Sequence, residues 1–428
     1  MLKFIKKKII CDKNYKKKSY YLMGCPLLTK EISTSGKKTK IFGVCVRHKK
    51  IKISQEKLQD ASLVKKEIEN IKDMNVPVIL WFDHTWGGGT ETYTNNQFKK
   101  LSISNLCVRI QGFKNKILKI SYFFKEKTNA CEIDEEQLSI FFEKMNGSLI
   151  VVNNLAGYHD EIEFLSKISD LKKQLKSYVS FRGHDFQCIC PSITMMNETG
   201  MYCNCKSLEN CHVCHLKIKE KIPIFTESIK LWQSSWKKFL ENTADEIIVF
   251  SNSTKEIFSH LYPKTNSKIQ IIPHEVIPLK KVRIPKHSGI NIGVLGAIGQ
   301  SKGVEVIEKI DNLLTEYPQV SLSIIGTLSS QKCKYVKVLG KYKPSNLPHI
   351  MTENKIDIVF IPSVWPETFS YTTAEAMSMG LPIACFNIGA PAERVAKYNK
   401  GLVIDKINAR YALEKILHFL EVLNEKEI

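Results

Sequence analysis

Short apolar runs alternate with amphipathic segments along most of the chain, which is the pattern of an α/β protein. From residue 76 onward, strands are predicted at VPVILWF, LCVRIQG, KILKISYFF, LIVVNN, SYVSFRG, EIIVFS and KIQIIPH. A second series is predicted at INIGVLG, VSLSIIG, YVKVLG, IDIVFIP, LPIACFN and GLVID, and an amphipathic helix ends the chain. Alternation of this kind predicts two mostly parallel, doubly wound sheets of Rossmann type.

The same pattern divides the chain into an extension and two domains. Residues 1–72 are lysine-rich and contain a weak repeat, in which YLMGCPLLTK aligns with KIFGVCVRHK and each copy predicts a short hairpin strand. Residues 73–273 form the first Rossmann-like domain, with a cysteine-rich insert at 188–214 where the periodicity disappears. A linker with three prolines and a basic run leads to the second domain at 289–428. We expect a ligand in the cleft between the domains.

Composition limits where the protein works. The chain has 428 residues and 43% hydrophobic content, which supports two or three domains and excludes a disordered protein. Apolar runs stay well below the roughly 18 residues that span a bilayer, and MLKFIKKKII lacks the apolar region of a secretory signal. Thirteen scattered cysteines fit a reducing compartment. We therefore expect a cytoplasmic protein.

Positive charge is concentrated at the beginning of the chain. The net charge is +20, and the first fifty residues contain 15 Lys or Arg against Asp12 and Glu31. Lysines beside apolar residues predict adsorption of residues 1–50 to an anionic membrane surface, at the inner face of the cell membrane. Nucleic acid is not an expected partner, because the aromatic residues of this segment match no recognisable RNA or DNA module.

Two glutamates follow a predicted strand near the end of the chain. In PSVWPETFSYTTAEAMSMGLPIACFNIGAPAERV, Glu367 lies in a loop and Glu375 lies in the helix that follows. Loops at the carboxyl ends of strands bind ligands in open α/β sheets, and the start of a helix offers N–H groups to an anion. The pair predicts a diphosphate site in which Glu367 accepts from sugar hydroxyls and Glu375 from a ribose diol. Two solvated carboxylates are the alternative.

One glycine-rich loop follows the first strand of each series. GAIGQSKG (Gly296–Gly303) opens a helix, so its backbone N–H groups can approach a phosphate while Lys302 adds a cation. It is neither a Walker A loop nor the G-x-G-x-x-G dinucleotide fingerprint. In DHTWGGGTETY, a triplet allows close approach of the backbone to a ligand: Gly87, Gly88 and Gly89. A tight turn without a ligand is the alternative for both loops.

Two parts of this pattern resemble a known family. The text PETFSYTTAEAMSMGLPIA followed by GAPAERV resembles the donor-sugar signature of retaining glycosyltransferase family 4, which has the GT-B fold and uses nucleotide sugars. The pattern HDF..CP, which contains His184, resembles a motif of one bacterial branch of that family that builds surface polysaccharide and lipopolysaccharide. The resemblance covers about residues 76–424. It implies an acceptor domain at 73–273 and a donor domain at 289–428.

The resemblance also implies roles for individual residues. Glu367 faces the donor sugar, Glu375 the ribose, and Lys302 the diphosphate. His184 contacts the sugar and has a positioning and electrostatic role, because the retaining chemistry of the family needs no protein nucleophile. The other implied donor-binding residues are Gly87, Gly88, Gly89, Gly299, Phe369, Ser370, Tyr371 and Thr372. The family often has an arginine before the lysine, where this chain has Ala297 and Ile298.

Four cysteines of the insert have a spacing that suggests a structural metal site. Cys190, Cys203, Cys211 and Cys214 form C-x12-C-x7-C-x2-C, and four thiolates can close a tetrahedral zinc site. The first pair is not C-x-x-C, so a disulfide or buried thiols are alternative interpretations. Catalysis is expected to need no metal, because the chain lacks an Asp-x-Asp motif.

These observations predict a retaining glycosyltransferase of GT-B architecture with a hexose-type donor. The expected acceptor is a lipid-linked or lipopolysaccharide-type glycan. Two rivals remain at this stage. One is a non-catalytic membrane or nucleic-acid adaptor on a degenerate fold, which the missing arginine favours. The other is a sugar-nucleotide epimerase of the same fold, which would release sugar or its isomer without an acceptor.

Overall fold

The computed structural model of the protein describes residues 5–12, 15–22, 25–33, 36–41, 44–49, 58–113, 115–204, 211–219 and 228–426. The chain forms two compact units, Met1–Leu58 and Gln59–Ile428. Within the described ranges, no helix is both long and apolar enough to cross a membrane.

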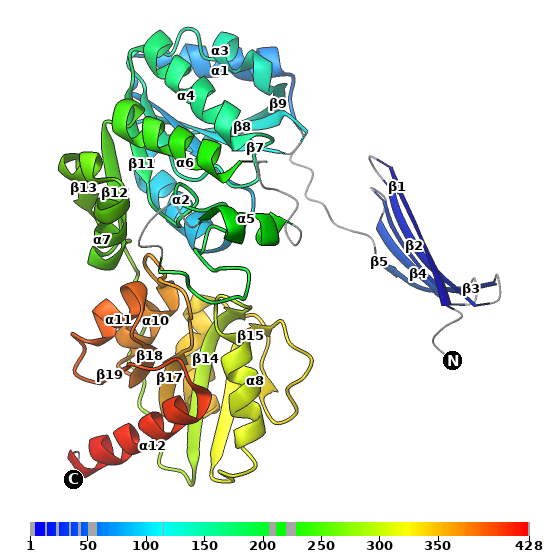
Figure 1. Ribbon diagram of the computed structural model, residues 1–428. Helices are drawn as coiled ribbons and strands as arrows, with labels where there is room; N and C mark the ends of the chain where they lie inside the picture. Colours follow the sequence, from blue (N-terminus) through cyan, green and yellow to red (C-terminus); the bar gives the residue numbers. More distant parts are fainter. Residues whose placement is uncertain are drawn as a thin grey trace. The chain divides into compact units, whose positions relative to one another are not determined.

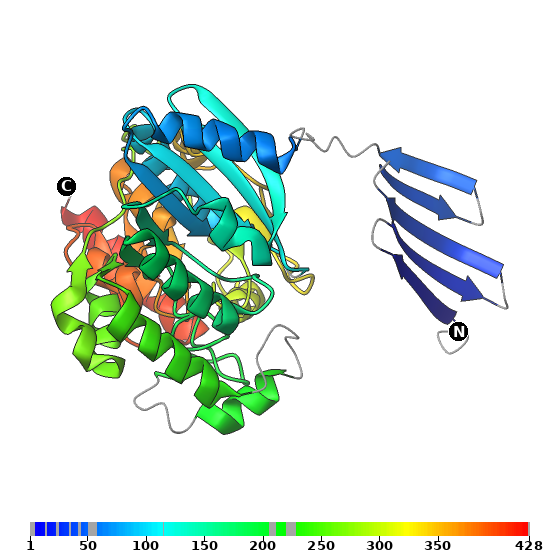
Figure 2. The same cartoon turned by 90° about the horizontal axis from the view of Figure 1, so that it is seen from above.

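The first unit contains one antiparallel sheet of five strands in sequential order (Figure 2). Its strands are β1 (Ile5–Asp12), β2 (Tyr15–Leu22), β3 (Cys25–Ser33), β4 (Gly36–Ile41) and β5 (Val44–Lys49). Each copy of the sequence repeat extends from one strand into the next, from β2 to β3 and from β4 to β5. Each copy therefore contains the turn of a hairpin and parts of both its strands. The sequence analysis predicted one short hairpin strand for each copy. The basic residues Lys3, Lys13 and Lys50 lie outside the described residues.

The second unit begins with an eight-stranded sheet in the order β13-β12-β11-β10-β6-β7-β8-β9. Its strands are β6 (Val78–Asp83), β7 (Leu106–Gly112), β8 (Ile117–Phe124), β9 (Lys127–Asp134), β10 (Leu149–Val152), β11 (Tyr178–Arg182), β12 (Glu246–Val249) and β13 (Ile269–Ile271). The strands from β13 to β7 are parallel, and β8 and β9 form antiparallel pairs at one edge. The mostly parallel sheet agrees with the strand and helix alternation in the sequence.

Helices cover both faces of this sheet (Figure 1). They are α1 (Ala61–Lys72), α2 (Gly88–Leu101), α3 (Leu138–Phe141), α4 (Glu161–Leu175), α5 (Cys211–Lys219), α6 (Ile229–Lys238) and α7 (Asn252–Leu261). Short single turns complete the connections at Glu135–Gln137, Phe239–Thr243 and Pro263–Lys268.

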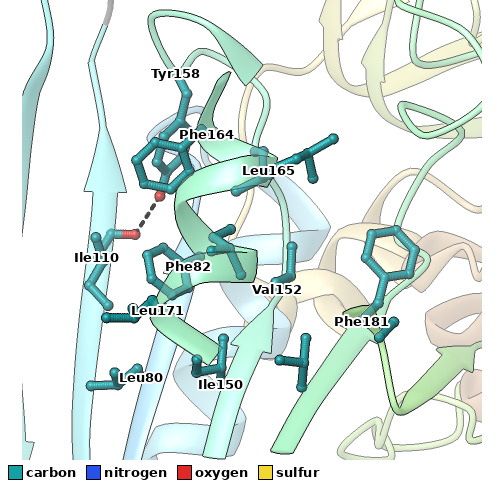
Figure 3. Close-up of a cluster of buried hydrophobic side chains, with 14 of the residues drawn as sticks. Leu80, Phe82, Ile110, Ile150, Val152, Tyr158, Phe164, Leu165, Leu171 and Phe181 are labelled. Carbon is teal, nitrogen blue, oxygen red and sulfur yellow. Dashed lines mark hydrogen bonds between the residues drawn. The ribbon is translucent and has the colours of Figure 1, made fainter. Parts of the chain in front are cut away.

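One face of the sheet forms the largest hydrophobic core. Figure 3 shows part of it, where Phe164 and Leu171 of α4 pack over Leu80 and Phe82 of β6. Burial of such side chains contributes about 1.5–3 kcal/mol each relative to exposure. The hydroxyl of Tyr158 donates to the Ile110 carbonyl oxygen at 2.7 Å, so this buried polar group keeps a partner.

The helix α1 belongs to this core. Its Val64, Ile68 and Ile71 form one apolar stripe at helical spacing and are buried against the sheet. The sequence analysis placed the end of the basic extension at residue 72. The structure instead places residues 61–72 with the eight-stranded sheet. The sequence analysis missed this, because the apolar stripe is hidden among lysines and glutamates.

Within this unit, we call the eight-stranded sheet the first sheet and the sheet that follows it the second sheet. The second sheet has six parallel strands in the order β16-β15-β14-β17-β18-β19. They are β14 (Ile290–Ile298), β15 (Val320–Leu328), β16 (Lys337–Val338), β17 (Ile358–Ile361), β18 (Ile383–Phe386) and β19 (Gly401–Ile404). Its helices are α8 (Val304–Leu313), α9 (Leu347–Glu353), α10 (Tyr371–Met379), α11 (Gly389–Val395) and α12 (Ala409–Lys426), with one further turn at Pro344–Asn346.

Alternate residues of the central strand point to opposite cores. Ile358 and Phe360 of β17 pack with α8 and α12, whereas Val359 and Ile361 pack with α9, α10 and α11. In Figure 1, α8 lies on one side of β14 and β17, and α10 and α11 lie on the other. The second sheet is therefore doubly wound, and the prediction of two Rossmann-like sheets is confirmed.

Contacts tie the two sheets of this unit together. The Glu393 carboxylate, at α11, accepts from the backbone N–H of Ser253 at 3.1 Å and from the Asn252 side chain, at the start of α7. A carboxylate there is stabilised by the positive end of the helix dipole. The linker lies along α10, where the Leu279 N–H donates to Ser378 Oγ at 3.1 Å and the Val282 N–H to the Met379 carbonyl at 3.0 Å.

Candidate functional site

The loops that follow the strands of both sheets meet one another. The Thr368 hydroxyl, in the loop after β17, donates to the His184 carbonyl oxygen after β11 at 2.7 Å. At the start of α2, a methyl group on Gly89 would lie 3.3 Å from the Tyr371 ring at the start of α10. The predicted ligand-binding edges therefore face each other, at the position where ligands bind in open α/β sheets.

The glycine-rich loop after β14 packs directly against the loop after β17. The Val364 N–H donates to the Ser301 carbonyl at 3.0 Å. Gly303 has a φ of 78°, and a Cβ there would lie 2.0 Å from the Pro362 carbonyl oxygen. Gly389 has a φ of 66°, and its Cβ would lie 2.7 Å from the Glu367 nitrogen. Only glycine fits both positions, and this close packing fixes the Glu367 loop.

Lys302 and Glu367 form an ion pair inside this arrangement. Lys302 Nζ lies 2.6 Å from Glu367 Oε1, and the two side chains are 33% and 5% exposed. The hydroxyls of Ser363 and Ser370 also donate to the carboxylate. Burial raises the pKa of Glu367, but the lysine charge and these hydrogen bonds outweigh it, so the pKa lies below its ordinary value. Glu367 is therefore ionised at neutral pH and accepts hydrogen bonds only.

The backbone at Ser370 has an uncommon conformation. Its φ is 68°, in the left-handed region that residues other than glycine seldom adopt. Arg394 holds this turn, because its Nη1 donates to the carbonyls of Phe369 at 3.2 Å and Ser370 at 3.1 Å. Its guanidinium also lies over the Phe369 ring, 4.7 Å from the centroid. The turn directs the Ser370 hydroxyl to Glu367, which is consistent with strain retained at a functional site.

Three helices begin at this site without a side-chain cap. The residues before α2, α8 and α10 make no hydrogen bond from their side chains to the helix amides. Elsewhere in this unit, α3, α9 and α11 also lack a side-chain cap, whereas α1, α4, α6 and α7 are capped by Asp60, Asp160, Ser228 and Ser251. Uncapped N–H groups and the positive ends of helix dipoles favour an anion. Together with Lys302, they form an electropositive region around Glu367.

Glu375 lies one turn inside α10 and is 8% exposed. The Tyr342 hydroxyl donates to its Oε2 at 2.9 Å. Burial raises the pKa of Glu375, and the tyrosine hydrogen bond opposes that rise. Because the tyrosine engages one carboxylate oxygen, the other remains as an acceptor for a ligand hydroxyl.

A chain of buried polar groups orients His184. The Asp83 carboxylate is fully buried, and it accepts from Arg109 Nη2 at 2.7 Å and from Asn153 Nδ2 at 3.0 Å. The Asn153 amide oxygen therefore faces His184 Nε2, 2.8 Å away, so that nitrogen carries the hydrogen. Burial lowers the pKa of His184 well below its ordinary value. The ring is neutral and suits a positioning role.

The remaining predicted donor-site residues lie at the same edges. Gly87 and Gly88 have φ values of 80° and 81° at the start of α2. A Cβ on Gly299 would meet no atom within 4 Å, so this part of the loop has open space beside it. A Cβ on Gly296 would lie 3.6 Å from Thr372 at the start of α10. The predicted residues thus come together, and their roles stay predictions.

Sequence reasoning missed three residues of this region. Arg394 was part of the text GAPAERV, but no role was assigned to it. Tyr342 follows the very short strand β16, so no local pattern places it beside Glu375. His274 lies just after β13, in the segment that was interpreted as linker. Position at the end of a predicted strand was the signal that could have found His274.

The four cysteines of the predicted zinc site are not joined by disulfide bonds to one another or to other described cysteines. Burial raises the pKa of Cys190 to about 11, and nearby Cys203 and Cys211 add to the rise. Among the described residues, however, no three His, Cys, Asp or Glu side chains are arranged so that they could hold a metal ion. A structural zinc at Cys190, Cys203, Cys211 and Cys214 stays a prediction.

Metal analysis of protein purified without added zinc tests this prediction. One zinc per chain is expected, and a folded metal-free protein would contradict it.

Comparisons with known proteins agree with the geometry. Residues 280–427 match the family "Glycosyl transferases group 1". HepE from Anabaena in complex with UDP has a TM-score of 0.52 and 11% identity, over 82% of this chain and 91% of that one. The lipopolysaccharide outer core galactosyltransferase WaaB, in its apo form, has a TM-score of 0.53 and 12% identity, over 82% and 91%.

A third solved structure is also similar. Sucrose-phosphate synthase from Thermosynechococcus elongatus has a TM-score of 0.52 and 14% identity, over 81% of this chain and 90% of that one. No curated protein sequence matches the chain. The second sheet is therefore similar to a glycosyl transferases group 1 domain, and the two sheets together have the GT-B fold. This confirms the predicted fold class.

Proposed function

We propose that the protein is a retaining glycosyltransferase that moves a hexose-type sugar from a nucleoside diphosphate to a glycan acceptor. The observation that carries the proposal is the Lys302–Glu367 pair beside three uncapped helix starts. The match of residues 280–427 to the group 1 glycosyl transferases supports it independently. HepE was solved with UDP, so a nucleoside diphosphate is a ligand of one protein with this fold.

The proposed division of work follows from charge. Cleavage of the bond between the sugar and the diphosphate develops negative charge on the leaving oxygens and positive character on the anomeric carbon. Lys302 and the N–H groups at the starts of α8 and α10 stabilise the leaving diphosphate. Glu367, which is ionised and oriented, accepts from the sugar hydroxyls. Glu375 accepts from the ribose, and His184 positions the sugar.

The acceptor is proposed from one solved structure with the same fold and from one sequence motif. WaaB, which has the same fold, acts on the lipopolysaccharide outer core. The motif around His184 resembles that of enzymes that build surface polysaccharides, so a lipid-linked or lipopolysaccharide-type glycan is the proposed acceptor. Catalysis is proposed to be independent of metal ions. The basic sheet of the first unit is proposed to bring the protein to the inner face of an anionic membrane.

Glu367→Gln tests the proposed role of the carboxylate with the least structural change. The amide keeps the shape and the hydrogen bonds to Ser363 and Ser370 but loses the charge. Loss of an interaction made mainly in the transition state costs about 2.7–4 kcal/mol, or roughly 100- to 1000-fold in kcat. Transfer is measured in EDTA, with product configuration determined by NMR. Glu353→Gln, on the exposed end of α9, is the matched control and should keep normal activity.

Lys302→Ala should lose transfer to a similar extent, but it should also lower the melting temperature. Removal of the ammonium leaves Glu367 buried without its cation, and an unpaired buried group costs about 1–3 kcal/mol. Lys309→Ala, on the exposed side of the neighbouring helix α8, is the control for loss of a lysine near this loop. Near-normal transfer by Glu367→Gln or Lys302→Ala, or a product with inverted configuration, would contradict the assignment.

Tyr342→Phe tests the environment of Glu375 through pH. The ionised carboxylate accepts more strongly from a ribose hydroxyl than the protonated form does, so affinity for a nucleoside diphosphate falls as pH falls through the pKa of Glu375. The tyrosine hydrogen bond favours the ionised form, and its loss raises that pKa further. The variant should therefore lose affinity for a nucleoside diphosphate at a higher pH than the wild type.

Calorimetric Kd values from about pH 5 to about pH 8 measure this difference. The ratio of the Kd of the variant to the Kd of the wild type, taken at each pH, cancels the effect of titration of the nucleotide phosphates. Tyr335→Phe, which changes an exposed tyrosine of the same segment, should follow the wild type. Identical pH profiles of Kd for Tyr342→Phe and the wild type would contradict the claim that the Tyr342 hydrogen bond tunes the pKa of Glu375 for nucleotide binding.

Removal of residues 1–50 tests the membrane proposal. This segment holds 15 Lys or Arg and two acidic residues, and each basic residue near an anionic surface contributes about 1 kcal/mol. The full chain should sediment with vesicles of phosphatidylglycerol and phosphatidylcholine at low salt and dissociate at high salt. The shortened chain should stay in the supernatant while keeping its nucleotide affinity. Equal sedimentation of both chains would contradict the proposal.

A further inference from the structure

His274 is a buried polar residue whose two ring nitrogens have no partner. It lies after β13 and is 8% exposed. Neither Nδ1 nor Nε2 has a hydrogen-bond partner among the described residues. Burial, with a further contribution from Arg394, lowers the pKa of His274 to about 3, so the ring is neutral at ordinary pH. It therefore offers one donor and one acceptor, both unsatisfied.

Aromatic rings from both sheets surround this imidazole. The first sheet contributes Phe250 and Tyr93, with ring centroids 4.1 and 4.6 Å from that of His274. The second contributes Phe369 at 4.3 Å and Tyr371 at 5.2 Å. A phenylalanine would fill this position without the cost of burying polar atoms, which is about 1–3 kcal/mol for an unsatisfied group. The choice of an imidazole calls for a binding explanation.

Two neighbours narrow that explanation. The ring of His184 lies 5.2 Å away, and its Nε2–H already donates to Asn153. His184 therefore has no N–H left to donate to a ligand, whereas His274 offers both an N–H donor and a nitrogen acceptor. The Tyr371 hydroxyl is also buried without a partner among the described residues. Unsatisfied polar atoms of His274 and Tyr371 thus gather where the carboxyl edges of the two sheets meet, and Tyr371 is four residues along the chain from Glu367.

We propose that His274 is a sugar-binding residue, which donates to one hydroxyl of the donor sugar and accepts from another. A sugar hydroxyl is both donor and acceptor, and the neighbouring aromatic rings suit the apolar faces of a pyranose. The rings of Phe369 and Tyr371 belong to the second sheet, so movement of the sheets away from each other exposes the imidazole to a ligand that enters between them. This inference rests on the proposed function and adds a specificity residue to it.

The test compares affinity for a nucleoside diphosphate with affinity for the same nucleotide carrying its sugar. Calorimetry is done with UDP, ADP and GDP and with their glucose conjugates, and the pair that the wild type binds best is taken forward. His274→Phe should lose about tenfold in affinity for the nucleotide sugar and keep its affinity for the diphosphate within about twofold. Its melting temperature should stay the same or rise, because two unsatisfied polar atoms are removed.

Two controls separate binding from packing. His274→Gln keeps a donor and an acceptor, so it should recover part of the affinity for the nucleotide sugar. Phe98→Leu disturbs the buried cluster that also contains Phe250 and Phe369, but its ring packs on Trp81 and Phe123, so it should not change the ratio between the two affinities.

The outcomes distinguish the inference from the function on which it rests. A ratio that His274→Phe leaves unchanged would overturn the role of His274 while the proposed function stands. Binding of none of the six nucleotides to the wild type would count against both.

Discussion

The site depends on one buried ion pair. Glu367 is almost fully buried, and a carboxylate in that position is stable only with a cation and hydrogen-bond donors around it. Lys302 and two serine hydroxyls supply them. The lysine comes from the loop after β14 and the glutamate from the loop after β17, so the pair joins two loops whose close packing requires glycine at 303. Gly389, at the start of α11, packs against the Glu367 loop from another side. The same contact thus fixes backbone geometry and keeps both charges in place for a ligand.

The two sheets contribute different things to the site. The second provides the charges, through Lys302, Glu367 and the starts of α8 and α10. The first provides a rigid, largely neutral wall, in which Asp83 and Asn153 lock His184 in one tautomer. Thr368 bridges the two through the His184 carbonyl. Charge on one side and oriented neutral groups on the other suit a reaction in which negative charge develops on the leaving group.

Much of the fold could be predicted from the sequence, because buried parallel strands are short apolar runs and the helices between them are amphipathic. Glu367, Glu375 and Lys302 could be proposed from the sequence because each lies within a few residues of a strand end or a glycine-rich loop. Tyr342 could not be assigned in the same way, since Glu375 is 33 residues away along the chain and becomes its neighbour only in the folded protein. His274 does lie at a strand end, but the sequence does not show that it meets Phe369 of the second sheet. The end of the basic extension was misplaced because charged residues hide the buried stripe of α1.

The central claim is that the Lys302–Glu367 region binds the diphosphate of a nucleotide. Thermal unfolding of the wild-type protein with saturating nucleoside diphosphates, in EDTA, tests it most directly. At a ligand concentration 100 times Kd, binding to the folded state adds about 2.7 kcal/mol of stability. The account predicts a clear rise in melting temperature with at least one nucleoside diphosphate, and a much smaller rise with the monophosphate of the same base. Equal rises with both, or no rise with any diphosphate, would contradict it.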